Sequence, residues 1–261
     1  MEYVEVDGLR LAYRRRGSGP CLLLLHGGLC DGRVWRVELD SLSDEFTVIA
    51  WDAPGCGESS DPPDHFRLPD YAACLDGLIA QLGVGPAHLL GHSWGSSLAL
   101  ELFRLHSDAV RSLILAAAYA GWAGSLPPDE VARRLEFALA VADLAPGDFT
   151  PTSLAGSFTD AIPVDRAAEL AGIMGAVRPS GTRAMARALA EADLRDVLPQ
   201  ISVPTLLLYG DADQRAPLDV AAAMRAAIPT STLTVLPGVG HECFLEAPEL
   251  THRAVRDFLG S

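Results

Sequence analysis

The sequence contains neither lysine nor asparagine, and all 20 basic residues among its 261 are arginine. Both missing amino acids have AT-rich codons, so a GC-rich coding sequence is the simplest interpretation. Acidic residues outnumber basic ones, and the formal net charge is −14. Nucleic acid and anionic membranes are poor partners for so acidic a surface. A few arginines can still form a positive pocket, so an anionic small molecule is not excluded as a substrate.

Membrane, export and metal signals are also missing. No apolar run reaches the length of a membrane span, and the first residues alternate rather than forming the apolar core of a secretory leader. The five cysteines are odd in number and unpaired in spacing, so we expect free thiols and a cytoplasmic protein. Because no H-E-x-x-H or paired C-x-x-C pattern occurs, we expect no metal and no cofactor.

Apolar runs alternate with amphipathic segments along most of the chain, which is typical of an α/β fold with a mostly parallel sheet. The pattern predicts a hairpin over 3–13, around Asp7-Gly8, and strands over 21–25, 47–51, 87–90, 112–119, 204–209 and 232–236. It predicts helices over 70–82, 96–106, 219–228 and 248–259.

The alternation stops between residues 122 and 196. This stretch is helical in pattern, with Pro and Gly breaks that include Pro179 and Gly181, and four short helices fit, for example 129–143 and 182–192. We therefore expect a core formed by 1–121 and 197–261 and a helical insertion formed by 122–196. The oligomeric state does not follow from the sequence.

The pentapeptide Gly91-His92-Ser93-Trp94-Gly95 lies between a predicted strand and a predicted helix. A serine on such a sharp turn has its hydroxyl exposed above the sheet. Glycine is needed at both ends because the turn brings backbones too close for side chains. The pattern G-x-S-x-G is weak alone, and its strand–turn–helix setting strengthens it.

Three further loops follow predicted strands. His26-Gly27-Gly28 follows the strand 21–25, and Gly210-Asp211-Ala212-Asp213 follows the strand 204–209. Gly238-Val239-Gly240-His241 follows the last strand. Loops after parallel strands meet at one edge of the sheet, which is where ligands bind in such folds.

With these motifs in this order, the chain resembles the α/β-hydrolase superfamily over essentially its whole length. The segment 52–59 is similar to the family's D-x-x-G-x-G-x-S loop, and the order serine, acid, histidine is the one that this fold imposes. The resemblance implies a mostly parallel twisted sheet flanked by helices. It also implies that the insertion 122–196 is a cap over the carboxyl ends of the strands.

The chemistry explains these residue types. A serine hydroxyl needs a base within hydrogen-bond reach, and histidine can take and return a proton because its ordinary pKa is about 6.5. A carboxylate behind the imidazole fixes its tautomer. We expect Ser93 as nucleophile, His241 as general base and then acid, and Asp213 as orienting carboxylate. Asp211 is the alternative acid, although we expect it to shape the turn.

The oxyanion of the tetrahedral intermediate is expected to accept hydrogen bonds from two backbone N–H groups. Trp94, at a helix N-terminus, supplies one. Gly28 supplies the other, with Leu29 as the alternative. Of the other histidines, we expect His26 to brace the loop beside this site. We expect His92 to pack away from the serine hydroxyl.

The resemblance implies that the cap selects the substrate. Residues expected to face the serine are Trp122, Leu126, Phe137, Phe158, Ile173 and Met174, together with Leu29 of the oxyanion loop. Arginines that could hold a substrate carboxylate are Arg178, Arg183 and Arg187, although a solvated helix face explains them better.

Serine rather than aspartate at position 93 sets aside dehalogenases and epoxide hydrolases of this fold. We expect hydrolysis of a small carboxylic ester or lactone through an acyl-enzyme. The segment 91–100 is also similar to the turn of proline iminopeptidases, but Leu29-Cys30 replaces their Pro-Gly. An aminopeptidase, a hydrolase of C–C bonds and a ligand-sensing regulatory protein remain alternatives.

Overall fold

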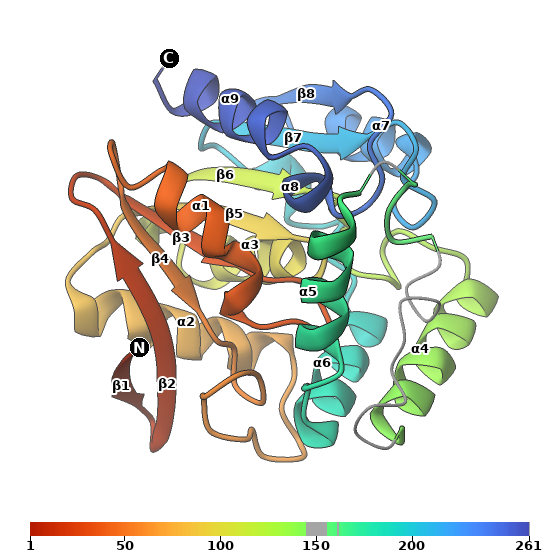
Figure 1. The fold of residues 1–261 in the computed structure, drawn as a ribbon, viewed down its shortest axis with the longest axis horizontal. Helices are drawn as coiled ribbons and strands as arrows, with labels where there is room; N and C mark the ends of the chain where they lie inside the picture. Colours follow the sequence, from red (N-terminus) through yellow and green to blue (C-terminus); the bar gives the residue numbers. More distant parts are fainter. Residues whose placement is uncertain (145–155, 161, 261) are drawn as a thin grey trace.

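The computed structural model describes residues 1–144, 156–160 and 162–260. These residues form one eight-stranded sheet in the spatial order β1-β2-β4-β3-β5-β6-β7-β8 (Figure 1). The strands are β1 Glu2–Val6, β2 Leu9–Arg16, β3 Cys21–Leu25, β4 Thr47–Trp51, β5 Ala87–His92, β6 Val110–Ala116, β7 Thr205–Gly210 and β8 Ser231–Leu236. From β4 to β8 every neighbouring pair is parallel, whereas β2 is antiparallel to both β1 and β4.

The hairpin of β1 and β2 turns at Asp7 and Gly8, as predicted. Both residues have left-handed backbone, with φ of 48° and 80°. Two-residue hairpin turns of this kind match the twist of the strands that they join, and Asp-Gly is a favoured pair for them. The local sequence was therefore sufficient to define this edge of the sheet.

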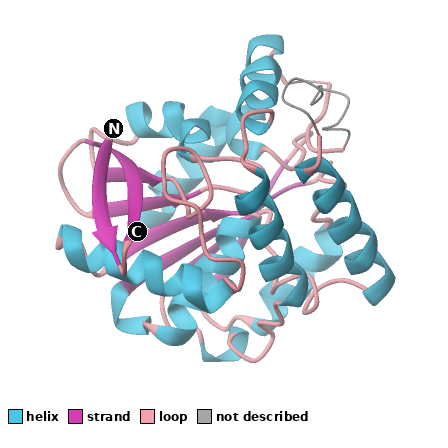
Figure 2. Ribbon diagram, turned by 90° about the horizontal axis from the view of Figure 1, so that it is seen from below, coloured by secondary structure: helices cyan, strands magenta, loops and turns pink. Residues whose placement is uncertain are grey.

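Helices cover both faces of the sheet (Figure 2). The structure has α1 Arg36–Ser41, α2 Leu68–Leu82, α3 Trp94–Leu105, α7 Leu218–Ala227, α8 Cys243–Glu246 and α9 Pro248–Leu259, with 3-10 turns η1 Gly32–Trp35, η2 Ser107–Ala109 and η4 Leu198–Gln200. In β3, Leu23 and Leu25 pack into one core with α2, α3 and α7, whereas Leu22 and Leu24 pack into a second core with α1 and α9. Burial on both faces explains why this strand is continuously apolar.

Within the described residues, three α-helices lie between β6 and β7: α4 Pro128–Ala142, α5 Val164–Met174 and α6 Pro179–Glu191. They lie at the carboxyl ends of the parallel strands (Figure 1). The sequence pattern suggested four helices here, and residues 145–155 and 161 are outside the described part. Helix α6 packs against α2, α3 and α4, and α5 packs against η1. The insertion therefore extends both cores of the sheet.

The start of α6 corrects one prediction. Pro179 and Gly181 were interpreted as breaks, with a helix from residue 182, but both lie in the first turn of α6. Proline is compatible with a first helical turn because its missing N–H has no partner to lose there. Glycine is required because a Cβ at Gly181 would lie 2.1 Å from the carbonyl oxygen of Gly55. A close contact with a distant loop thus explains a residue that suggested a break.

Candidate active site

Ser93 occupies a strained turn between β5 and α3. Its backbone has φ 50° and ψ −109°, a left-handed conformation that costs a non-glycine residue roughly 1–3 kcal/mol. A Cβ at Gly91 would lie 2.4 Å from the carbonyl oxygen of Gly95, and one at Gly95 would lie 2.2 Å from that of Leu25. Both glycines of the pentapeptide are therefore required by the close approach of backbones.

His241 and Asp213 form a buried pair at the ends of β8 and β7. His241 Nδ1 lies 2.9 Å from Asp213 Oδ2. The other carboxylate oxygen, Oδ1, accepts hydrogen bonds from the N–H groups of Arg215, at 2.8 Å, and Ala216, at 2.9 Å. This arrangement fixes the carboxylate and leaves the Nε2 of His241 available to another partner.

The charges of this pair follow from burial and contact. Burial opposes ionisation of Asp213, but His241 and the two N–H donors outweigh it and lower the pKa of this carboxyl. Burial also lowers the pKa of the His241 imidazole, although Asp213 acts in the opposite direction. At neutral pH the pair is therefore a carboxylate beside a neutral imidazole, as a general base requires.

Asp211 lies in the same loop but has a different contact. Its Oδ1 accepts a hydrogen bond of 2.6 Å from the N–H of Gly238, across the turn that leads to His241. The side chain thus ties the loop after β7 to the loop after β8. It has no hydrogen bond to His241 among those of the described residues.

Three residues whose backbone N–H groups have no described partner line the cavity that contains Ser93. Gly28, Leu29 and Trp94 line this cavity together with Ser93 and His241. Within the described residues, none of the three N–H groups donates a hydrogen bond, and Trp94 is the first residue of α3. Leu29 rather than Gly28 has left-handed backbone, with φ 60°. Free N–H donors at this place can stabilise a negative oxygen.

Two histidines hold the surrounding loops. His26 is buried, with Nδ1 2.8 Å from the carbonyl oxygen of Gly27, and its Nε2 accepts a hydrogen bond of 3.1 Å from the N–H of Ala53. The ring of His92 lies with its Nε2 3.0 Å from the carbonyl oxygen of His241, and burial lowers its pKa to about 4. A neutral His92 ring that donates this bond holds the turn that carries His241.

The structure brings some, but not all, of the expected substrate-contacting residues to the cavity. Leu29, Trp122, Phe137 and Met174 line it. Phe158 is not among the lining residues, because its side chain packs against the second core.

Leu126 and Ile173 do not line the cavity either. Leu126 packs on the first core, and Ile173 is buried in the second. On α5 the cavity meets Met174, the residue after Ile173, because successive helical side chains point about 100° apart.

One helix face that the sequence analysis overlooked contributes much of the lining. The residues are Thr182, Met185, Ala186 and Leu189 of α6. Their spacing of i, i+3, i+4 and i+7 marks one face of a helix, so the pattern was present in the sequence. Nothing local distinguished a cavity face from an ordinary buried face.

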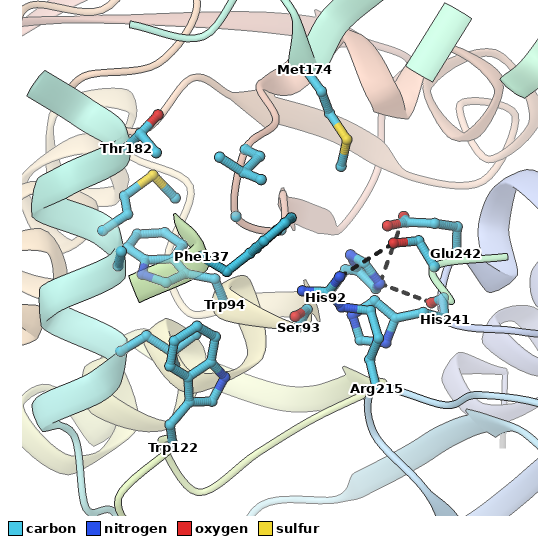
Figure 3. A pocket seen from close by; sticks show the side chains of 17 residues that line it. His92, Ser93, Trp94, Trp122, Phe137, Met174, Thr182, Arg215, His241 and Glu242 are labelled. Carbon is cyan, nitrogen blue, oxygen red and sulfur yellow. Dashed lines mark hydrogen bonds and ion pairs between the residues drawn. The ribbon is translucent and has the colours of Figure 1, made fainter. Parts of the chain in front are cut away.

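The cavity also contains polar groups that were not predicted: Ser157, Arg215 and Glu242. Figure 3 shows Trp94, Trp122 and Phe137 on one side of Ser93 and Arg215, His241 and Glu242 on the other. Burial raises the pKa of Glu242 to about 7. The cavity thus has an apolar end and a polar end.

The arginines considered from sequence lie elsewhere. Arg178 pairs with Asp61 at 3.0 Å, Arg183 pairs with Asp143, and Arg187 is exposed. Among the described residues, no group of three or more His, Cys, Asp or Glu side chains could hold a metal ion, and no helix is long and apolar enough to cross a membrane.

Known proteins resemble the whole chain. An esterase from Thermogutta terrifontis, solved with malate bound, superposes with a TM-score of 0.91 at 30% identity, over 100% of this chain and 98% of that one. A pimeloyl-(acyl-carrier protein) methyl ester esterase from Vibrio vulnificus is 29% identical over 96% of this chain and 98% of its own. A proline iminopeptidase from Lactobacillus helveticus is 30% identical over 88% of this chain and 86% of its own.

All three relatives are hydrolases. The model of the alpha/beta hydrolase fold family matches residues 20–248, most of the sheet and all of the loops described above. On this evidence the chain belongs to the alpha/beta hydrolase family.

Proposed function

We propose that the protein is a serine hydrolase that cleaves a small carboxylic ester through an acyl-enzyme intermediate. The observation that supports this most directly is the shared cavity: Ser93 lines it from a strained turn, and so does His241, whose Nδ1 lies 2.9 Å from Asp213. A serine, a neutral imidazole and a buried carboxylate are the groups that acyl transfer to water needs.

In this mechanism His241 takes the proton of the Ser93 hydroxyl as its Oγ attacks the ester carbonyl carbon. Asp213 stabilises the imidazolium that forms. The N–H of Trp94 and that of Gly28 or Leu29 stabilise the oxyanion. His241 then gives its proton to the leaving alcohol, and the acyl group stays on Ser93. Water, activated by His241, releases the acid and restores the serine.

The relatives support an ester substrate, and the size of the cavity supports a small one. The cavity has a volume of about 80 Å³, which suits a short acyl group. Two of the relatives described above are esterases. A lactone presents the same carbonyl chemistry, and the ring oxygen replaces the alcohol as leaving group.

An aminopeptidase is the second candidate because the relative from Lactobacillus helveticus is a proline iminopeptidase. Such a substrate carries a free amine, which an ionised carboxylate would bind. Among the described lining residues Glu242 is the one carboxylic acid, but burial favours its neutral form, and the positive charge of Arg215 lies close to it. These surroundings disfavour an ammonium group.

The direct test is intact-mass spectrometry after treatment with a fluorophosphonate, which reacts with activated serines. One adduct is expected on the native protein and none on Ser93→Ala, whereas Ser97→Ala, in the same helix, keeps it. Ser93→Ala should also reduce ester turnover by as much as ~10⁶-fold. An adduct that persists in Ser93→Ala would refute the assignment. A panel of p-nitrophenyl esters, lactones and proline anilide then identifies the substrate class.

A further inference from the structure

Arg215 brings a positive charge into the cavity. Among the described lining residues it is the one with a permanent cation. It follows Asp213 by two positions, on the loop after β7, and lies beside the polar groups near Ser93 (Figure 3). The protein as a whole carries a net charge of −14, which repels an anionic substrate. The guanidinium of Arg215 is a local positive charge that attracts such a substrate to the cavity.

The backbone and the side chain of Arg215 have different contacts. Its N–H donates to Asp213, and its carbonyl oxygen accepts hydrogen bonds from the hydroxyl of Tyr119 and from Arg134. The guanidinium has one hydrogen bond within the described residues, a long one of 3.4 Å from Nη1 to Ser157 Oγ. Backbone contacts thus hold the loop. Among the described residues, the guanidinium has only the long hydrogen bond to Ser157.

No carboxylate of the described residues lies within ion-pair distance of this guanidinium. Arg178 and Arg183 differ from Arg215 in this respect, since each pairs with an aspartate. Arginine presents five donors in a planar fork that matches a carboxylate. A half-buried arginine without an anionic partner, beside a reactive serine, therefore has unused capacity for an anion from the ligand.

Glu242 forms no ion pair with the guanidinium of Arg215. Its Oε2 is buried, has no hydrogen-bond partner among the described residues, and lies 3.8 Å from His92 Nε2. Burial raises the pKa of this carboxyl to about 7, while His241 and Arg215 act in the opposite direction. In its neutral form Glu242 can donate a hydrogen bond. A ligand carboxylate would then meet donors from both Arg215 and Glu242.

We propose that Arg215 is a specificity-determining residue that binds a carboxylate of the substrate. The preferred substrates are half-esters of short dicarboxylic acids, in which one carboxyl is esterified and the other is free. The free carboxylate binds at the polar end of the cavity, and the ester carbonyl is presented to Ser93. This inference rests on the proposed function, and it deepens it by naming the substrate class.

The test compares two substrates that differ by one methyl group, anionic monomethyl glutarate and neutral dimethyl glutarate. Arg215→Gln removes the charge, and its backbone contacts remain. Loss of a charged hydrogen-bonded pair is expected to reduce kcat/KM for the half-ester about 10–100-fold, mainly through KM. The neutral diester should change less than about threefold, which is near the scatter of independent sites.

Arg187→Gln is the matched control, because it makes the same change on the exposed side of α6. This variant should leave kcat/KM unchanged for both substrates. Arg215→Lys keeps the charge without the planar fork, so it should retain part of the preference for the half-ester. Equal losses on both substrates in Arg215→Gln would mean a structural role and would overturn the inference, as would no loss on either.

Binding separates this inference from the proposed function. Glutarate should bind to Ser93→Ala in a calorimetric titration, and much more weakly when Arg215→Gln is added. If no ester is hydrolysed but glutarate binding depends on Arg215, the hydrolase assignment fails and the anion site stands. If neutral esters are hydrolysed best and glutarate does not bind, the hydrolase stands and the anion site is refuted.

Discussion

One side of the cavity is formed by loops that follow strands of the sheet, and the other side is formed by the helices between β6 and β7. Different features of the chain determine the structure of each side. The loops after β5, β7 and β8 position Ser93, Asp213 and His241 through their backbones, with glycines that admit no side chain and N–H groups that hold a carboxylate. Helices α4, α5 and α6 contribute side chains from one face each, and Phe137 is 42% exposed. We infer from this difference that catalysis depends on the geometry of the loop backbones, whereas selectivity depends on side chains, both those of the three helices and that of Arg215.

The largest expected effect is a difference in kcat between substitutions of two aspartates in the loop after β7. Asp213→Asn leaves His241 without its carboxylate and favours the wrong imidazole tautomer, so kcat should fall by roughly 10⁴-fold. Asp211→Asn keeps an oxygen that can accept the hydrogen bond from the N–H of Gly238, so it should cost less than about tenfold, the effect of one net hydrogen bond. The measurement is kcat for ester hydrolysis by both variants and by the native protein. The reverse order would transfer the acid role to Asp211.

Gly95→Ala tests the rigidity of the loop side. The new Cβ would lie 2.2 Å from the carbonyl oxygen of Leu25, a backbone atom that cannot move aside alone. Overpacking of this kind should lower the free energy of unfolding by about 1–3 kcal/mol. Gly172→Ala is the control, because Gly172 lies exposed on α5 with nothing near its Cβ, and alanine there should be neutral or stabilising.

Urea denaturation of both variants measures these changes. Equal stabilities would show that the approach of the backbones around Ser93 is not a constraint. The fluorophosphonate reaction of Gly95→Ala adds a second readout, because a displaced turn should also slow labelling of Ser93.

The pH dependence of ester hydrolysis reports the state of His241. The base must be unprotonated, and burial lowers its pKa below the ordinary value of about 6.5. We therefore expect kcat/KM for a neutral ester to rise with pH and to level off with a midpoint below 6.5. His92, with its pKa at about 4, should not contribute near this midpoint. A midpoint above 6.5 would mean that Asp213 outweighs burial.

The smallest effect should come from the side of the cavity that α4, α5 and α6 form. Phe137→Ala removes a half-exposed ring from the cavity, so KM for short esters should change less than about tenfold while kcat stays near its native value. Phe158→Ala is the matched control, since Phe158 does not line the cavity. A large loss of kcat in Phe137→Ala would contradict the inference that the helix side chains affect selectivity and not catalysis.

The sequence predicted the central sheet closely because its signals are local. The strands 21–25 and 47–51 match β3 and β4 residue by residue, and their continuous apolar character comes from burial on both faces. The predicted start of α6 was wrong, because proline and glycine usually indicate the end of a helix. Gly181 is instead required by its close contact with Gly55, which the sequence does not show. Local patterns do not report contacts with distant loops.

The loop motifs that carry Ser93, Asp213 and His241 were readable in the sequence because each requires particular residue types at fixed spacing after a strand. The composition of the cavity was not. Phe158 was expected in it and packs against the second core, whereas Arg215 and Glu242 were not considered and line it. Whether an apolar or charged side chain faces a cavity, a core or solvent depends on how elements from distant parts of the chain pack, and only the tertiary structure decides that.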